Sequence, residues 1–316
     1  MILDNEIVRK YTYKVYGMDI KSEIFLPELL PVSNKEDDYA DVTISYGVMP
    51  KDIRHELENG QMYRFRKNEM WFSIKEVANY YIYNGNTIIV EPYLNGNMEY
   101  IKIFLLGSAF GMLLIQRDMV AIHGSTVIVD GQGVIFTGES GTGKSTLTAA
   151  FREKGYAFLA DDVSVTSKGI DGVSIINPGY PQQKLCKDAM EKMGYDTDKF
   201  IMIDSDRDKY AIPVCNDFFK EAVSLGAVFE LTVGEVNNVS INEIVGSEKL
   251  KVLLKNIYRI ELTSYVGMSP SYFKNCIDIV KKIPLYRVIR PKNSFSVEQQ
   301  IELITKTLRS INRKSI

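Results

Sequence analysis

The sequence predicts an α/β (α+β) fold, in which a β-rich front part precedes a mixed α/β body. Between Tyr11 and Tyr100, short runs rich in aromatic and β-branched residues alternate with turn signals such as Asn84-Gly85, a pattern typical of strands and hairpins. Further along the chain, strand-like runs alternate with helical segments. We therefore expect a β-rich N-terminal region over residues 1–100 and a second domain over residues 101–316.

The first long helix is expected over about residues 97–116. Its most apolar part, from Ile103 to Ile115, has 13 residues. This is too short to cross the roughly 30 Å of a bilayer's hydrocarbon core. The run therefore predicts a buried core helix and no membrane span.

The body begins with two strand-like runs joined at Asp130-Gly131, a pair of residues typical of a tight hairpin. A helix is expected after Gly143, and Gly155 ends it. The run YAFLADDVSVT that follows predicts another strand. Three further helices are expected near residues 247–258, 269–282 and 296–309.

The composition excludes several classes of protein. With 45% hydrophobic and 25% charged residues, the chain matches an ordinary globular protein. Its 38 basic and 40 acidic residues leave a net charge of −2, which disfavours general nucleic-acid binding. The N-terminus has no apolar core behind basic residues, and Cys186, Cys215 and Cys276 share no metal-type spacing. A cytoplasmic protein without a disulfide framework is expected.

One motif stands out. Residues 138–145 read GESGTGKS and match G-x-x-x-x-G-K-[ST], a phosphate-binding loop between a strand and a helix. Amide groups at the helix start would point at the phosphates, Lys144 would reach the β- and γ-phosphate oxygens, and Ser145 would ligate Mg²⁺. The alternative is a glycine-rich turn without a ligand. The expected nucleotide-binding residues are Gly138, Glu139, Ser140, Gly141, Thr142, Gly143, Lys144, Ser145, Thr146 and Lys184.

Acidic residues provide candidates for the chemistry. Asp161 and Asp162 end the next strand, where one carboxylate could serve Mg²⁺ through water and the other could accept a proton from a hydroxyl. The alternative is a solvated acidic turn. Glu139 adds negative charge inside the loop, so it either points outward or acts through a metal.

Two histidines are present, and only one has a functional context. His123, in AIHGST, is expected on the strand that runs antiparallel to the strand before the loop. There it would hydrogen-bond to the active acid or to the transferred phosphoryl group, with a purely structural role as the alternative. His55 is expected at the surface.

A proline-rich turn, NPGYP, aims the residues that follow it. Lys184 and Lys187 could reach the γ-phosphate or an acidic group of a partner, and Lys209 is a second candidate. Solvated surface lysines are the alternative reading.

Taken in order, H-G-S, G-E-S-G-T-G-K-S, A-D-D and P-G-Y-P resemble the catalytic core of HPr kinase/phosphorylase and its relatives, a core related to the ATP-type phosphoenolpyruvate carboxykinases. The resemblance covers about residues 120–215. It implies a compact α/β P-loop domain that uses ATP and Mg²⁺ to phosphorylate a serine hydroxyl. Asp161 would be the general base and Asp162 the metal-side acid, with His123 in support and Lys144 on the phosphates. The resemblance leaves open which aspartate has which role.

Two departures point away from HPr itself. Thr146 stands where the family usually has Glu, and the C-terminal signature of the family is missing. The front segment YKVYGMDIKSEIFLPEL resembles kinase-like homologues found beside peptide-modifying enzymes. In lasso-peptide pathways, some of these relatives phosphorylate a serine, often the C-terminal one, of a precursor peptide. A peptide with an acceptor serine is therefore the expected partner, and a homo-oligomer is left open.

Two other functions remain as alternatives at this point. One is a kinase that acts on the hydroxyl of a small molecule, and the other is a nucleotide-binding regulatory protein without transfer. A carboxykinase-like enzyme is disfavoured, because we would expect a longer chain with more metal-ligating residues.

Overall fold

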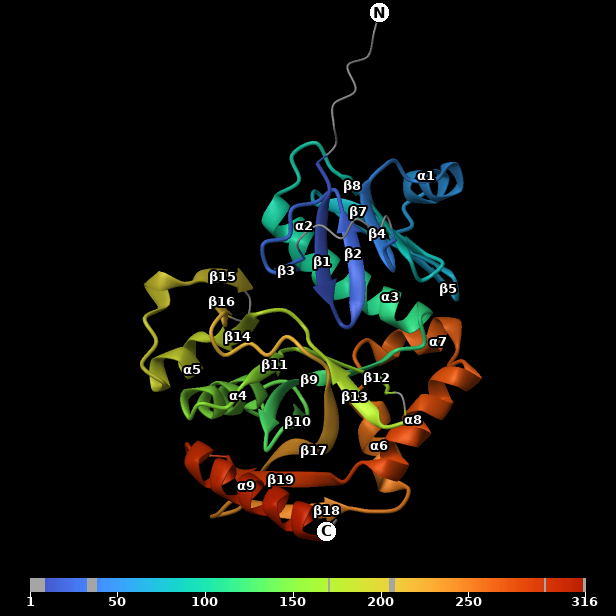
Figure 1. The fold of residues 1–316 in the computed structure, drawn as a ribbon. Helices are drawn as coiled ribbons and strands as arrows, with labels where there is room; N and C mark the ends of the chain where they lie inside the picture. The colour runs from blue at the N-terminus through green and yellow to red at the C-terminus, as the bar shows by residue number, and fades with distance from the viewer. Residues whose placement is uncertain (1–8, 33–38, 170, 205–207, 293, 315–316) are drawn as a thin grey trace, which may run out of the picture. The chain divides into compact units, whose positions relative to one another are not determined.

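The computed structural model describes residues 9–32, 39–169, 171–204, 208–292 and 294–314 (Figure 1). The chain divides into two compact units. The first consists of Met1–Asp118 with Glu261–Met268, and the second of Met119–Ile260 with Ser269–Ile316. The sequence predicts a boundary near residue 100, whereas in the structure the helix that begins at Met98 belongs with the first unit.

The first unit contains an eight-stranded sheet in the order β3-β1-β2-β4-β8-β7-β6-β5. Its hairpin between β7 and β8 turns at Asn84 and Gly85, whose φ angles of 54° and 65° suit the tight turn that the sequence predicts. The β-rich character expected for this region is confirmed. The strands are β1 (Tyr11–Val15), β2 (Met18–Ser22), β3 (Leu30–Pro31), β4 (Val42–Tyr46), β5 (Tyr63–Arg66), β6 (Glu69–Ile74), β7 (Ala78–Tyr83) and β8 (Thr87–Pro92).

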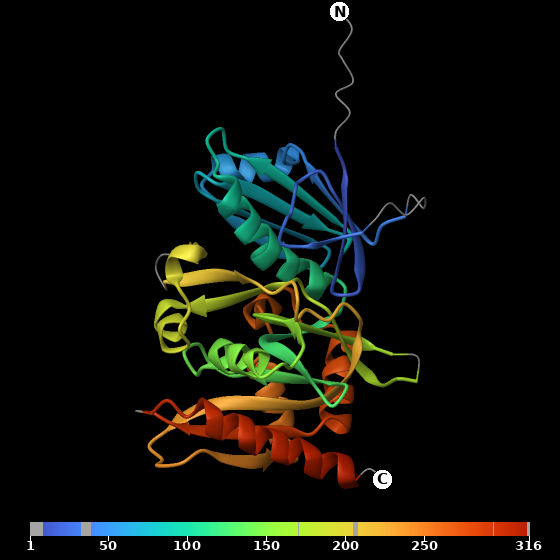
Figure 2. The ribbon, with the colours of Figure 1, turned by 60° about the vertical axis from the view of Figure 1, so that its left-hand side comes forward.

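Helices accompany this sheet. The helix expected near residues 97–116 is confirmed as α2 (Met98–Phe104), a π-helical turn η1 (Leu105–Ala109) and α3 (Phe110–Gln116), and it packs against β7 (Figure 2). By length and composition alone it could cross a membrane, but 56% of its apolar window is buried, as in a core helix. The unit also holds α1 (Lys51–Glu58), which carries the exposed His55, and α7 (Thr263–Val266).

The second unit is built on a sheet with the order β10-β9-β12-β13-β17-β19-β18. Because β10 also pairs with β17, five strands form a closed hydrogen-bonded ring: β9, β12, β13, β17 and β10. The strands of this sheet are β9 (Val120–Val129), β10 (Gln132–Thr137), β11 (Phe158–Ala160), β12 (Val163–Lys168), β13 (Ser174–Asn177), β17 (Val223–Gly234), β18 (Ser240–Ile244) and β19 (Leu285–Pro291). A smaller sheet orders β14 (Gln182–Cys186), β16 (Lys209–Pro213) and β15 (Ile201–Asp204).

Most local predictions for this unit are confirmed, but the single strand predicted over YAFLADDVSVT is two strands, β11 and β12, which Asp161 and Asp162 separate. The hairpin between β9 and β10 turns at Asp130 and Gly131, both with positive φ, and Gly155 follows α4 with a φ of 85°. The three C-terminal helices are present as α6, α8 and α9. The helical segments of this unit are α4 (Lys144–Glu153), α5 (Lys187–Lys192), η2 (Thr197–Lys199), α6 (Glu248–Lys255), α8 (Pro270–Lys282) and α9 (Val297–Lys314). The short helix η3 (Ile260–Leu262) begins at the last residue of the segment Met119–Ile260 and continues into the first unit.

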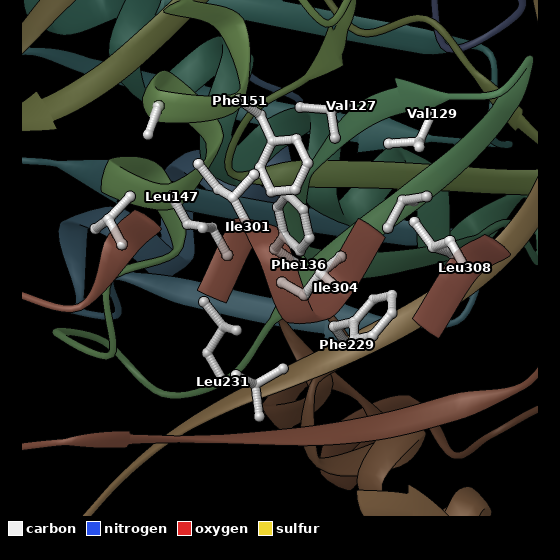
Figure 3. Packing of buried hydrophobic residues seen from close by; sticks show 14 of the residues in the cluster. Val127, Val129, Phe136, Leu147, Phe151, Phe229, Leu231, Ile301, Ile304 and Leu308 are labelled. Carbon is white, nitrogen blue, oxygen red and sulfur yellow. The ribbon is translucent and has the colours of Figure 1, made fainter. Parts of the chain in front are cut away.

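An aromatic core supports the strand that leads into the glycine-rich loop. Phe136 on β10 packs against Phe151 on α4, with ring centroids 5.1 Å apart, and all three of Phe136, Phe151 and Phe229 are fully buried. Ile301 and Ile304 of α9 complete the same cluster (Figure 3). Burying a side chain of this size contributes about 1.5–3 kcal/mol. The core therefore fixes both ends of the loop, β10 before it and α4 after it.

Candidate functional site

The loop 138–145 requires glycine at three places. Gly138, Gly141 and Gly143 have φ angles of 133°, 82° and 100°, which side-chain-bearing residues rarely adopt. Space is a second constraint at Gly138, because a Cβ there would lie 2.4 Å from the carbonyl oxygen of Leu231. The loop can therefore pass this close to β17 only with glycine at its start.

The N-terminus of α4 has free hydrogen-bond donors. Gly143 precedes the helix without a side-chain cap, and the first turn contains no acidic residue. Within the described residues, the amides of Lys144, Ser145 and Thr146 donate no hydrogen bond to the protein. Such amides, together with the dipole of the helix, form a binding site for an anion.

Lys144 lies within the loop. Its Nζ donates to the carbonyl oxygens of Gly138 at 2.8 Å and Glu139 at 2.9 Å. Burial lowers the pKa of Lys144, while Asp162 and Asp161 oppose the change. The Glu139 side chain, by contrast, is exposed and pairs with Lys255 of α6 at 2.7 Å. Of the two orientations that the sequence allows for Glu139, the structure shows the outward one.

Strand pairing brings the loop next to the two aspartates. On one side of β9, Gly124 pairs with Thr137, the last residue before the loop. On the other side, His123 pairs with Val163, the residue after Asp162. The segment that carries His123 therefore lies between the phosphate loop and the acidic turn, as the sequence predicts for a strand antiparallel to β10.

Asp161 is a buried part of the framework. Its Oδ1 accepts a hydrogen bond from the Ser125 hydroxyl at 2.5 Å, and its Oδ2 accepts one from the backbone N–H of Lys184 at 2.8 Å. Burial raises the pKa of Asp161 despite these bonds, and the nearby charge of Asp162 adds to the effect. Both carboxylate oxygens are thus engaged by the protein itself.

Asp162 is more accessible and lies beside Lys184 and His123. Its backbone has a φ of 66°, and its side chain is 26% exposed. Oδ2 lies 3.1 Å from Lys184 Nζ, and Oδ1 lies 3.5 Å from His123 Nδ1. Burial acts to raise the pKa of Asp162, but the positive charge of Lys184 outweighs it and holds the pKa well below its usual range. Asp162 is therefore ionised across the physiological pH range.

The protonation of His123 follows from its partners. Nδ1 lies 3.1 Å from the backbone oxygen of Asp162, and because a carbonyl oxygen only accepts, Nδ1 carries the hydrogen. Burial lowers the pKa of His123, although Asp162 opposes the change. The neutral ring therefore keeps Nε2 as an acceptor. The Tyr258 ring stacks on it, with centroids 6.2 Å apart.

The predicted lysines occupy different environments. Lys184 pairs with Asp162, and although burial acts to lower its pKa, Asp162 outweighs burial and raises it. Lys209 lies on the neighbouring strand opposite Cys186, and its charge helps to lower the pKa of Asp162. Lys187 is exposed at the start of α5.

Four further residues belong to the site but were not predicted individually. Ser125 and Tyr180 lie in the H-G-S and P-G-Y-P motifs, and burial raises the pKa of Tyr180 to about 12. Tyr258 and Arg290 come from distant segments. Arg290 Nε donates to the carbonyl oxygen of Thr142 at 2.8 Å from a position 148 residues later. Pattern reading can find the first two, whereas only the fold brings the last two to the loop.

The donor atoms suit a divalent ion that arrives with a phosphate ligand. The described residues contain no group of three or more His, Cys, Asp or Glu side chains that could hold a metal by itself. The Ser145 hydroxyl and the Asp162 carboxylate are, however, oxygen donors of the kind that Mg²⁺ takes. Mg²⁺ typically binds through one or two carboxylates and completes its shell with phosphate oxygens and water. The residues present therefore fit Mg²⁺ bound together with a polyphosphate.

No protein-family model matches the chain, and no curated protein matches it. Among solved structures, the chain is similar to the Hpr(Ser) kinase/phosphatase from Coxiella burnetii, with 16% sequence identity and a TM-score of 0.31. The match covers 62% of this chain and 97% of that chain.

The Gly138→Ala variant is expected to lose phosphate binding. Its Cβ would lie 2.4 Å from the Leu231 carbonyl oxygen, so the loop must move and its amides lose their alignment. We expect the affinity for Mg²⁺-ATP to fall by about tenfold or more, which corresponds to ~1.4 kcal/mol. Isothermal titration calorimetry with Mg²⁺-ATP measures the loss. Gly155→Ala is the matched control, since it also has a positive φ but nothing within 4 Å of its Cβ. Wild-type affinity in Gly138→Ala would contradict the role of this close approach.

Replacing Lys184 with Met should lower the stability of the second unit by about 1–3 kcal/mol, because Asp162 loses its charged partner. The pairing lowers the pKa of Asp162 and raises that of Lys184. The difference in unfolding free energy between variant and wild type is therefore largest between about pH 4 and pH 10, the usual pKa values of the two groups. Outside that range the difference becomes smaller. Chemical denaturation at several pH values measures it.

The exposed Lys187, three residues along, provides a control for the loss of a lysine. Lys187→Met should leave stability unchanged at every pH. A pH-independent difference between Lys184→Met and the wild type would mean that the ion pair is not its cause.

Proposed function

We propose that this protein is an ATP- and Mg²⁺-dependent kinase that transfers the γ-phosphoryl group to a serine hydroxyl of a peptide. The observation that carries the proposal is one juxtaposition. A glycine-bent loop with unbonded amides and a lysine inside it lies beside an ionised, partly exposed carboxylate, that of Asp162. The first feature suits a phosphate tail, and the second suits the orientation of an attacking hydroxyl.

The binding roles follow from the donors in the loop. The amides of residues 143–146 would hold the β- and γ-phosphates, and the ammonium of Lys144 would exchange loop carbonyls for phosphate oxygens. Mg²⁺, where bound beside Ser145 and Asp162, would neutralise charge on the phosphates. Phosphoryl transfer through a loose transition state depends mainly on such positioning and charge stabilisation.

We assign the roles of the two aspartates differently from the sequence-based expectation. The sequence predicts Asp161 as the base, but both of its oxygens accept hydrogen bonds from Ser125 and Lys184. Asp162 has the accessible carboxylate. We therefore assign to Asp162 both the metal side, as predicted, and the orientation of the acceptor hydroxyl. Asp161 then holds the acidic turn in place.

His123 and Lys184 support Asp162 from either side. Lys184 keeps the carboxylate ionised, and His123 offers Nε2 as an acceptor while its Nδ1–H is bonded to the Asp162 backbone. Neither group needs to change its charge during transfer. The site is thus suited to align a hydroxyl with the γ-phosphate.

The proposal that the acceptor is a peptide rests on sequence resemblance. It is supported by the four ordered motifs that resemble HPr kinase and its relatives and by the front segment that resembles the peptide-modifying branch. A lasso-type precursor with a C-terminal serine is the specific form that this resemblance suggests.

The direct test is incubation with Mg²⁺-ATP and a serine-containing precursor peptide, followed by mass spectrometry. A gain of about 80 Da on the peptide, lost when the serine is replaced by alanine, would support the proposal. Release of ADP driven by a free hydroxy compound would instead indicate a small-molecule kinase. Tight ATP binding with no acceptor-dependent ADP release would indicate a regulatory protein.

In this assay the Asp162→Asn variant is expected to lose about 10² to 10⁴ in transfer rate while it still binds ATP. Asp161→Asn should be much milder. Its amide oxygen can still accept from the Lys184 N–H, and its NH₂ group can donate to the Ser125 oxygen, so both contacts of the turn are kept although one hydrogen bond is reversed. The opposite ranking of the two variants would restore Asp161 as the base.

A further inference from the structure

We infer that Arg290, at the end of β19, is a positioning residue for the phosphate tail, because it turns the peptide group between Thr142 and Gly143 so that the Gly143 amide faces the ligand. The inference rests on the proposed function only in naming a polyphosphate as the ligand. No motif in the sequence points to this residue.

The guanidinium of Arg290 contacts the loop through two of its nitrogens. Nε donates to the Thr142 carbonyl oxygen at 2.8 Å, and Nη2 donates to that of Gly141 at 3.3 Å. Nη1 donates to the backbone oxygen of Pro291 at 3.1 Å, which holds the head group against its own strand. The rigid planar fork of arginine can hold two neighbouring carbonyls at fixed angles, which the point charge of a lysine cannot.

The direction of the carbonyls sets the direction of the amides. In a trans peptide group, the C=O and the following N–H point to opposite sides, and the described residues contain no cis peptide. When the Thr142 carbonyl points to Arg290, the Gly143 N–H points away from it. That N–H has no hydrogen-bond partner among the described residues. Arg290 therefore adds one oriented donor to those of Lys144, Ser145 and Thr146.

The charge of Arg290 is also uncommitted. Its neighbour Arg287 is neutralised by Glu230 at 2.8 Å and Glu248 at 2.9 Å. Arg290 forms no ion pair with a carboxylate in the part of the chain that the structure describes, and burial lowers its pKa. A half-buried guanidinium bonded only to carbonyl oxygens favours an anion on the far side of the loop.

The test compares Arg290→Met and Arg290→Lys with Lys292→Met, an exposed lysine just beyond β19. Calorimetry would measure binding of two probes, Mg²⁺-ATP and Mg²⁺-tripolyphosphate. We expect Arg290→Met to weaken both by the same factor, about tenfold or more, and Arg290→Lys to recover part of the loss. Lys292→Met should match the wild type. In kinetics, KM for ATP should rise far more than kcat falls.

Equal affinity of Arg290→Met and the wild type for both probes would overturn the inference. So would a loss of affinity that accompanies a lowered unfolding temperature in both Arg290 variants, because the residue would then be structural. Wild-type protein that binds tripolyphosphate but not ATP would refute the proposed function, yet the tripolyphosphate comparison would still decide the role of Arg290.

Discussion

The site depends on the pairing of one strand with two neighbours. β9 pairs with β10 on one side and with β12 on the other, so that Gly124 meets the start of the loop and His123 meets the end of the acidic turn. Antiparallel register allows no slip of one residue without turning every side chain to the other face. The buried residues of β9 and β10 prevent such a slip. The distance between the phosphate loop and Asp162 is therefore set by the hydrophobic core.

Within that frame, burial gives two adjacent aspartates different properties. Asp161 is buried, and its carboxylate accepts hydrogen bonds from the Ser125 hydroxyl and the Lys184 backbone N–H. Asp162 adopts a positive φ, and its carboxylate lies beside Lys184 and His123. Neighbouring strand residues normally face opposite sides, and the left-handed backbone at the second position is what directs that side chain to the site. A strained conformation at a non-glycine residue beside a candidate site is consistent with a functional constraint.

Much of this arrangement could be predicted locally, and the remainder could not. The loop, the hairpin at Asp130-Gly131 and the helix that ends at Gly155 are encoded by short-range signals, and the structure contains all three. The different roles of Asp161 and Asp162 depend on the φ angle and on hydrogen bonds, and two identical neighbouring residues in a sequence reveal neither. Tyr258 and Arg290 reach the site through strand and segment pairings formed over more than a hundred residues, so no local pattern marks them.

Overall charge was a poor guide to local charge, and the reason is structural. The chain as a whole carries a net charge of −2, yet Lys144, Lys184 and Arg290 approach a region where Asp162 is the accessible acid. A few cations gathered by folding create a local positive potential without changing the protein's average. Such a compact excess suits a short, highly charged ligand such as a triphosphate better than an extended polyanion, whose binding requires a broad basic face.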